Sequence, residues 1–223
     1  MKKMYYDKIA DLMLFSIDFK EGDKLIVTLN HDCREAVKNL VYKAYEEGAA
    51  FVALRYMDDF VNAAAIRAGK NSVDYPDYYE AFLRETCEPG WKSVNYSSFT
   101  EGDVYGKLDK EISTRFFKQY QDIIKYRREK ILSGAIAWTL TFIPTAYSAV
   151  KVFPDLSEDE AVAAYWKEVI RIMRLDLDDP VLFWKEKFRK DAERSKYLTG
   201  LAPEYIEFKG PGTDLKVGIN PHV

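Results

Sequence analysis

Residues 25–29 read Leu-Ile-Val-Thr-Leu and residues 50–54 read Ala-Phe-Val-Ala-Leu, and these two short apolar runs decide the fold. Uninterrupted runs of this kind are typical of strands buried on both faces of a parallel sheet. Between them, Asp32 followed by Glu35 resembles a capping box, and Gly48 stands where a helix C-cap would lie. A strand, a helix and a second strand within about 30 residues predict a βαβ unit with a right-handed crossover.

The rest of the chain extends this unit into an α/β fold, with a parallel or mixed sheet of about five strands flanked by helices. One long amphipathic helix is expected over residues 108–131, interrupted by Arg127 and ended by Gly134. Further strands are expected at residues 91–96, 135–143 and 215–219, and further helices after a capping box at Ser157 and after Asp179-Pro180. The pattern predicts a Rossmann-like domain with long helical insertions.

No linker-like change of composition divides the 223 residues. We therefore expect a single α/β domain over residues 1–223. Its first part, residues 1–133, holds the βαβ unit and helices, and its second part, residues 134–223, has a strand-helix-helix-strand order. The closing strand stops shortly before Val223, where a hairpin partner or a polar tail would be more usual, so we expect the natural chain to continue.

The composition excludes several classes of protein. Basic and acidic residues nearly balance, 33 against 36, so the chain lacks the basic excess of a nucleic-acid-binding protein. No apolar run approaches the length of a membrane span, and the charged N-terminus lacks the apolar segment of a signal peptide. Cys33 and Cys87 are therefore expected to be reduced thiols in a cytoplasmic protein. With two histidines, His31 and His222, the chain has too few for a His-rich zinc site.

The turns after the first two strands are the best-placed candidates for ligand binding. In open α/β sheets, ligands bind beyond the carboxyl ends of the strands. This rule selects His31 after the first strand and Asp58 after the second as a strand-end ligand site. His31 has the chemistry of a general base. However, Asp32 is already explained as a helix cap, and a single loop histidine is more often simply solvated.

The remaining motifs favour structural roles. The turn after the first strand lacks the glycines of a phosphate-binding loop, and Gly210-Pro211-Gly212 favours a turn. Asp176-Leu177-Asp178-Asp179 precedes Pro180, which favours a helix start over a Ca²⁺ or Mg²⁺ site. Three of the four tryptophans lie at positions typical of core packing. Residue chemistry alone therefore predicts an α/β domain without a complete catalytic site.

An ordered series of segments resembles the thermophilic-type metallo-aminopeptidases, the family of aminopeptidase T and aminopeptidase S. The series comprises GAIAWTLTFIPT at residues 134–145, AVKVFPD at residues 149–155, DLDDP at residues 176–180 with Trp184, and FKGPGTDL at residues 208–215. Gly22-Asp23-Lys24 and Gly90-Trp91 also resemble the N-terminal half of that family. The resemblance covers essentially the whole chain.

The resemblance implies a two-domain cytoplasmic exopeptidase that forms a homodimer and removes N-terminal residues from peptides. It also implies two divalent metal ions (zinc, cobalt or manganese), held in the second domain by glutamate, histidine, aspartate and tyrosine side chains. No such motif matches here, so no catalytic residue and no metal ligand is carried over to this chain. The resemblance therefore implies that the chain is the N-terminal domain, inactive alone, whose partners are peptide substrates and its own C-terminal domain.

Thr213 and Asp214, at the expected domain junction, are the candidates for contacts to the substrate cleft, although a turn-forming role is the simpler one. A different class stays open: a stand-alone α/β module that binds a small ligand or peptide near His31 and Asp58 without catalysis. The enzyme hypothesis predicts metal-dependent release of amino acids when downstream sequence is present. The module hypothesis predicts ligand-induced stabilisation of this chain alone, and a pure dimerisation scaffold would show neither.

Overall fold

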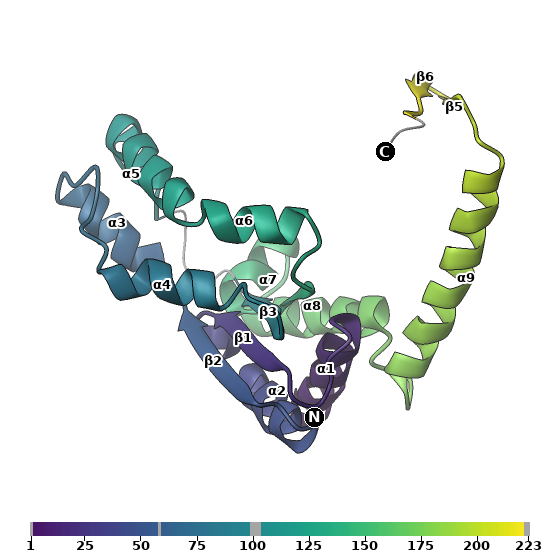
Figure 1. Ribbon diagram of the computed structural model, residues 1–223, viewed down its shortest axis with the longest axis horizontal. Helices are drawn as coiled ribbons and strands as arrows, with labels where there is room; N and C mark the ends of the chain where they lie inside the picture. Colours follow the sequence, from purple (N-terminus) through teal and green to yellow (C-terminus); the bar gives the residue numbers. More distant parts are fainter. Residues whose placement is uncertain (1, 58, 99–103, 221–223) are drawn as a thin grey trace. The chain divides into compact units, whose positions relative to one another are not determined.

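The computed structural model describes residues 2–57, 59–98 and 104–220, which fall into two compact units, Met1–Asp178 and Asp179–Val223 (Figure 1). The larger unit is built on a parallel sheet with the strand order β2-β1-β3-β4. The smaller unit consists of one helix followed by an antiparallel hairpin. The expectation of one domain over residues 1–223 stays a prediction.

Among the described elements, one or more helices separate successive strands of the larger unit, as the sequence predicts. In the larger unit they are α1 (Lys2–Ser16), β1 (Lys24–Leu29), the 3-10 helix η1 (His31–Cys33), α2 (Arg34–Glu46), β2 (Phe51–Tyr56), α3 (Asp59–Arg67), α4 (Asp77–Glu85), β3 (Trp91–Ser97), α5 (Lys110–Ile123), α6 (Lys125–Leu132), β4 (Trp138–Phe142), α7 (Ala146–Val152) and α8 (Glu158–Met173). In the smaller unit they are α9 (Pro180–Gly200), β5 (Tyr205–Gly210) and β6 (Thr213–Gly218).

Strand β1 lies at the centre of the sheet and is covered on both faces. It pairs in parallel with β2 on one side and with β3 on the other, and Ile26 stands opposite both Ala53 and Ser93. Leu25, Ile26 and Val27 are completely buried. The βαβ unit expected from the two apolar runs is thus confirmed, with α2 as its crossover helix.

Helices cover the two faces of this sheet in separate layers. On one face, Phe82 of α4 packs against the buried cluster of Ile26, Ala53 and Trp91. Helix α6 reaches the same face, because the Arg127 guanidinium donates a hydrogen bond to Ser93 Oγ at 2.7 Å. Helices α1 and α2 pack against each other on the opposite face (Figure 1).

The long helix expected over residues 108–131 is instead two helices, α5 and α6, that meet at Ile124. The prediction was wrong because the two halves have different neighbours: α5 packs against α3, and α6 packs against α4. Arg127, which seemed to interrupt an apolar row, is itself buried and faces the sheet. A single straight helix would not reach both neighbours.

The sheet of the larger unit has four strands within the described residues, rather than about five. The segment expected as a closing strand instead forms the hairpin of β5 and β6, which turns at Pro211-Gly212. Strand β4 is an edge of the sheet, and its Trp138 is 45% exposed, so this tryptophan is not the core residue we expected.

The helix signals were mostly correct. Ser157 and Glu160 form the expected capping box of α8, and the Asp179 carboxylate accepts a hydrogen bond from the Leu182 amide at 2.8 Å, as an N-cap should. Asp32 does not cap α2, because it lies inside η1 and the residue that precedes the helix is Cys33. The continuous turn from η1 into α2 leaves Asp32 no position from which to cap.

Gly48 ends α2 in the left-handed region, with φ of 90°, while the amide of Ala49 donates to the Ala44 carbonyl at 2.8 Å. A Cβ atom at position 48 would lie 2.7 Å from Cγ of Glu21. Gly134 ends α6 with φ of 71° and has open space around the same position. The two glycines therefore share a backbone conformation but differ in their surroundings.

We expect Gly48→Ala to lower the free energy of unfolding by about 2–3 kcal/mol, because it adds a steric clash to the cost of a left-handed alanine. Gly134→Ala, the matched control, is expected to cost about 1 kcal/mol, since it carries the conformational cost alone. Urea denaturation followed by circular dichroism measures both values. Equal losses in the two variants would contradict the close packing of Gly48 against the turn at Glu21.

Arg127→Ala is expected to lower the free energy of unfolding by about 3 kcal/mol. The substitution removes the hydrogen bonds to Ser93 Oγ and to Cys87 Sγ and leaves a void under α6. Its neighbour Arg128 is exposed and donates to Gln121, so Arg128→Ala is expected to change stability by less than about 0.5 kcal/mol. The same denaturation experiment compares them, and a small loss for Arg127→Ala would show that α6 is not anchored through this side chain.

Candidate functional site

The carboxyl ends of β1 and β3 are joined by a polar link. The Asn30 side-chain amide donates to the Ser98 carbonyl at 2.5 Å, and the Ser98 hydroxyl donates to Asn30 Oδ1 at 2.7 Å. The Cys33 thiol donates to Ser98 Oγ at 3.5 Å. In these contacts the side chains of Asn30 and Ser98 are hydrogen-bonded to each other. The polar residues at the carboxyl ends of β1 and β3 therefore have a structural role.

A thiol and a phenol close to this link are kept protonated. Burial raises the pKa of the Cys33 thiol, and the hydrogen bond to Ser98 opposes the shift without reversing it. Burial also raises the pKa of the Tyr96 hydroxyl, which is enclosed inside the unit without a hydrogen-bond partner among the described residues. A nucleophilic cysteine needs a lowered pKa. Cys33 is therefore a buried packing thiol, not a nucleophile.

The structure describes one of the two strand-end residues selected from the sequence. His31 opens η1 and is exposed to solvent. Asp58, like His222, lies outside the residues that the structure describes. A ligand site built on His31 and Asp58 stays a prediction.

Thr213 and Asp214 are the first two residues of β6 in the smaller unit. Thr213 pairs with Gly210 and Asp214 pairs with Lys209, directly after the turn at Pro211-Gly212. Both side chains are exposed. The Gly-Pro-Gly segment thus forms the expected turn, and a role for the two residues in a substrate cleft remains a proposal.

The acidic segment before α9 does not form a metal site. Asp179 is used as the helix cap, and within residues 2–57, 59–98 and 104–220 no three side chains of histidine, cysteine, aspartate or glutamate converge. A divalent ion in a protein takes several such ligands at once. The described part of the chain therefore does not fit a metal centre, and no reaction step through a metal is derived for it.

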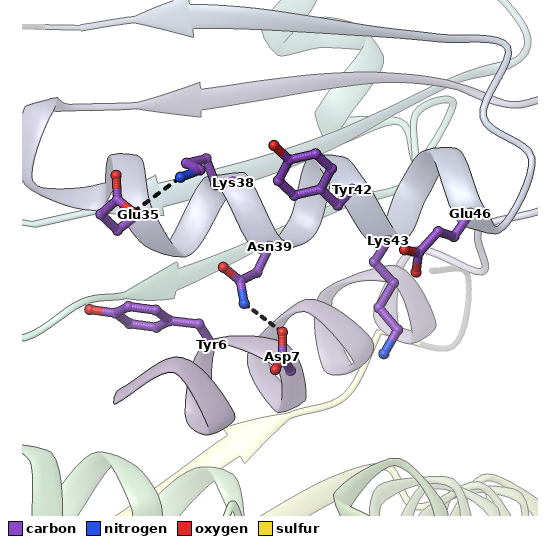
Figure 2. A pocket seen from close by; sticks show the side chains of 8 residues that line it. All are labelled: Tyr6, Asp7, Glu35, Lys38, Asn39, Tyr42, Lys43 and Glu46. Atoms are coloured by element: carbon purple, nitrogen blue, oxygen red, sulfur yellow. Dashed lines mark hydrogen bonds and ion pairs between the residues drawn. The ribbon is translucent and has the colours of Figure 1, made fainter. Parts of the chain in front are cut away.

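A groove of about 800 Å³ runs between α1 and α2 (Figure 2). Two of its lining residues, Tyr6 and Asp7, come from α1, and the others come from α2. Figure 2 shows Asn39 pointing across the groove to Asp7, and its side-chain amide donates to Asp7 Oδ1 at 2.5 Å. The groove is thus bridged by a direct contact between the two helices.

Both lysines of this groove form ion pairs. Lys38 lies 3.5 Å from Glu35, and Lys43 forms an ion pair with Asp11 of α1. Tyr6 is half-buried, and burial, followed by the neighbouring Cys33 and Glu35, raises the pKa of its hydroxyl. A protonated phenol is not a general base. The groove is therefore best described as a polar interface between α1 and α2.

A second polar cluster lies on the opposite face of the sheet, toward the carboxyl end of β2. Arg55 donates from Nη2 to the Tyr120 hydroxyl at 2.7 Å and to the Tyr79 hydroxyl at 3.5 Å. The Tyr79 ring stacks on the ring of Tyr75, with centroids 5.1 Å apart. We call Arg55, Tyr75, Tyr79 and Tyr120 the arginine–tyrosine cluster. It brings together β2, α4, α5 and the loop that precedes α4.

The loop that carries Tyr75 is fixed to α5 by Gln119. The Gln119 side chain accepts from the Val73 amide at 2.9 Å and donates to the Val73 carbonyl at 2.8 Å. This two-point contact replaces a pair of backbone hydrogen bonds and holds the loop in one position. Tyr75 is thereby held against Tyr79.

Our sequence analysis missed the arginine–tyrosine cluster. One signal was available: Arg55 is a charged residue in the second half of an otherwise apolar strand, and a long cation inside a buried strand needs partners. The partners themselves were not predictable, because Tyr79 and Tyr120 come from helices distant in sequence. None of the described helices is long and apolar enough to cross a membrane.

Comparison with known proteins identifies the family. Residues 3–223 match the family model described as Thermophilic metalloprotease (M29). Aminopeptidase T of Thermus thermophilus is 30% identical over 223 residues, which are 97% of this chain and 54% of that protein. Aminopeptidase AmpS of Bacillus subtilis is 26% identical over 203 residues, which are 90% of this chain and 49% of that protein.

The fold agrees with a solved structure of the same group. The structure titled wild-type AmpT from Thermus thermophilus superimposes with a TM-score of 0.83 at 25% identity, over 98% of this chain and 54% of that chain. The chain spans about half the length of the curated relatives it matches. The resemblance found in the sequence is confirmed: this chain belongs to the thermophilic metalloprotease family, whose similar members are named aminopeptidases.

Proposed function

We propose that this chain is the N-terminal domain of a two-domain metallo-aminopeptidase that removes N-terminal residues from peptides. The observation that carries the proposal is the family match, which runs over residues 3–223 while the chain spans about half of each relative. The family implies divalent metal ions. The described residues hold no cluster that fits a metal centre. We therefore assign the two ions (zinc, cobalt or manganese) and the hydrolytic chemistry to the other half of the parent protein.

In this proposal the larger unit is a rigid body that bounds the substrate cleft. Its central strand is completely buried at Leu25, Ile26 and Val27, and its faces are covered by separate helical layers. Such a body keeps its shape without a bound partner. It supplies a wall against which a peptide and the second domain are placed. The parent protein is proposed to be cytoplasmic and homodimeric.

The hairpin of the smaller unit supports the idea of a further domain. Large apolar side chains on both of its strands are exposed, among them Phe208 at 50% and Leu215 at 51%. A two-stranded hairpin is marginally stable by itself in water, and exposed apolar area of this size is usually covered by a partner. We propose that the C-terminal domain covers it, and that Thr213 and Asp214 there face the substrate cleft.

The 223-residue chain, incubated with leucine para-nitroanilide and added Zn²⁺, Co²⁺ or Mn²⁺, is expected to release no detectable nitroaniline. The longer product of the same gene, read past the codon for Val223, is expected to hydrolyse the substrate and to lose that activity with EDTA. The physical reason is that hydrolysis by a metal needs a converging ligand set. Absorbance of the released nitroaniline measures both proteins.

Circular dichroism of the short chain serves as the control, because an unfolded sample would also be inactive. Chelator-sensitive hydrolysis by the folded 223-residue chain alone would contradict the proposal that the metal ions and the hydrolytic chemistry belong to the second domain. A stop codon directly after Val223 would also contradict it, since the proposal requires a second domain encoded downstream.

A further inference from the structure

We propose that the arginine–tyrosine cluster is a binding site for the carboxylate group of an amino acid or of a peptide C-terminus. Arg55 would bind the carboxylate, and the phenols of Tyr79 and Tyr120 hold the guanidinium in position. This binding site goes beyond the proposed peptidase activity, because its ligand binds residues of this chain and needs no metal.

The first argument is that Arg55 is a half-buried cation without an anion. Its described hydrogen bonds are to the hydroxyls of Tyr120 and Tyr79, at 2.7 Å and 3.5 Å. No carboxylate of the described residues forms an ion pair with it, although most other ion pairs of the chain join side chains that are close in sequence on exposed helix surfaces. A phenol carries no charge at neutral pH, so hydrogen bonds compensate part of the burial of the guanidinium, but no described anion balances its charge.

The second argument concerns the unused donors. A guanidinium has five N–H groups in a planar fork, and Arg55 uses one nitrogen, Nη2, for both phenols. Nε and Nη1 have no protein partner among the described residues, and because Arg55 is only partly buried, each keeps some contact with solvent. An arginine with one edge held and another edge open is arranged for two parallel hydrogen bonds to an oxyanion.

The third argument is that the cluster is rigid. Tyr79 is held by stacking on Tyr75, and the loop of Tyr75 is fixed by the double contact between Gln119 and Val73. Arg55 itself projects from a strand of the sheet, where the backbone is fixed by pairing with β1. A binding group that is already immobilised loses little conformational entropy when the ligand arrives.

The surroundings select a carboxylate over a phosphate. A cavity of about 500 Å³ lies beside the cluster: Tyr75 lines it together with Asp74, Asp77 and Glu80, while Arg55 is not among its lining residues. These acidic residues repel a dianionic phosphate more strongly than a monoanionic carboxylate. The stacked rings of Tyr75 and Tyr79 offer an apolar surface, so a carboxylate with an apolar or aromatic body fits best.

The test is an NMR titration of the 223-residue chain with N-acetyl-L-phenylalanine and, separately, with its neutral C-terminal amide. The acid is expected to bind saturably with a dissociation constant of about 1 mM and to shift the signals of Arg55, Tyr79 and Tyr120. The amide is expected to bind at least about ten-fold more weakly, because it cannot accept two charge-assisted hydrogen bonds. Equal binding of acid and amide, or saturable shifts that leave this cluster unchanged, would overturn the proposal.

Free L-phenylalanine distinguishes the two sources of carboxylate. Tighter binding of the free amino acid indicates a site for a released amino acid, and tighter binding of the acetylated form indicates a site for a peptide C-terminus. Either order supports the carboxylate site, provided that the amide binds more weakly than both. Failure of both acids to bind would overturn it.

Arg55→Gln is expected to abolish the shifts caused by the acid, and Arg55→Lys to weaken binding several-fold, because lysine lacks the planar fork. Arg84→Gln is the matched control: Arg84 lines the cavity beside Tyr75 but is paired with Glu80, and its loss is expected to leave binding unchanged. If Arg55→Gln does not fold, the proposal is still tested by Arg55→Lys and by the comparison of acid with amide in the unaltered chain. The test is independent of the proposed function, because peptidase activity is not its readout.

Discussion

A strand that is buried on both faces determines the architecture of the larger unit. Leu25, Ile26 and Val27 of β1 are completely buried, so their backbone groups cannot be satisfied by water and must pair with neighbouring strands on both sides. β2 and β3 provide that pairing in parallel. Parallel pairing in turn needs crossover connections that return each strand to the same end of the sheet. The helical layers on both faces follow from this one constraint.

The same constraint explains which parts of the fold could be predicted. The two apolar runs and the end of α2 at Gly48 are local signals, and they identified β1, β2 and the helix between them. The division of one long helix into α5 and α6 is a tertiary effect, because each half packs against a different helix. Its apolar row continues across Ile124 in the sequence, so periodicity alone could not reveal the break. The hairpin was missed because one of its strands resembled a closing strand of the main sheet.

The candidate sites could likewise be predicted only in part from the sequence. The rule that ligands bind beyond strand ends selected an edge of the sheet whose central polar atoms are occupied by the link between Asn30 and Ser98. A sequence shows which residues are polar, and it does not show which of them satisfy one another. Arg55 was overlooked for the converse reason. It looks like an irregularity in a strand until Tyr79 and Tyr120 are placed beside it.

Two arginines on one face of the sheet illustrate how burial separates structural from binding roles. Arg127 is 6% exposed and uses both terminal nitrogens, Nη1 and Nη2, on Cys87 and Ser93. Arg55 is also held by uncharged partners, but through one nitrogen, and its other two nitrogens have no partner among the described residues. A purely structural arginine needs its donors satisfied inside the protein. The described contacts of Arg127 use both of its terminal nitrogens, whereas those of Arg55 use one, so Arg55 is the arginine of the two that keeps a terminal nitrogen for a ligand.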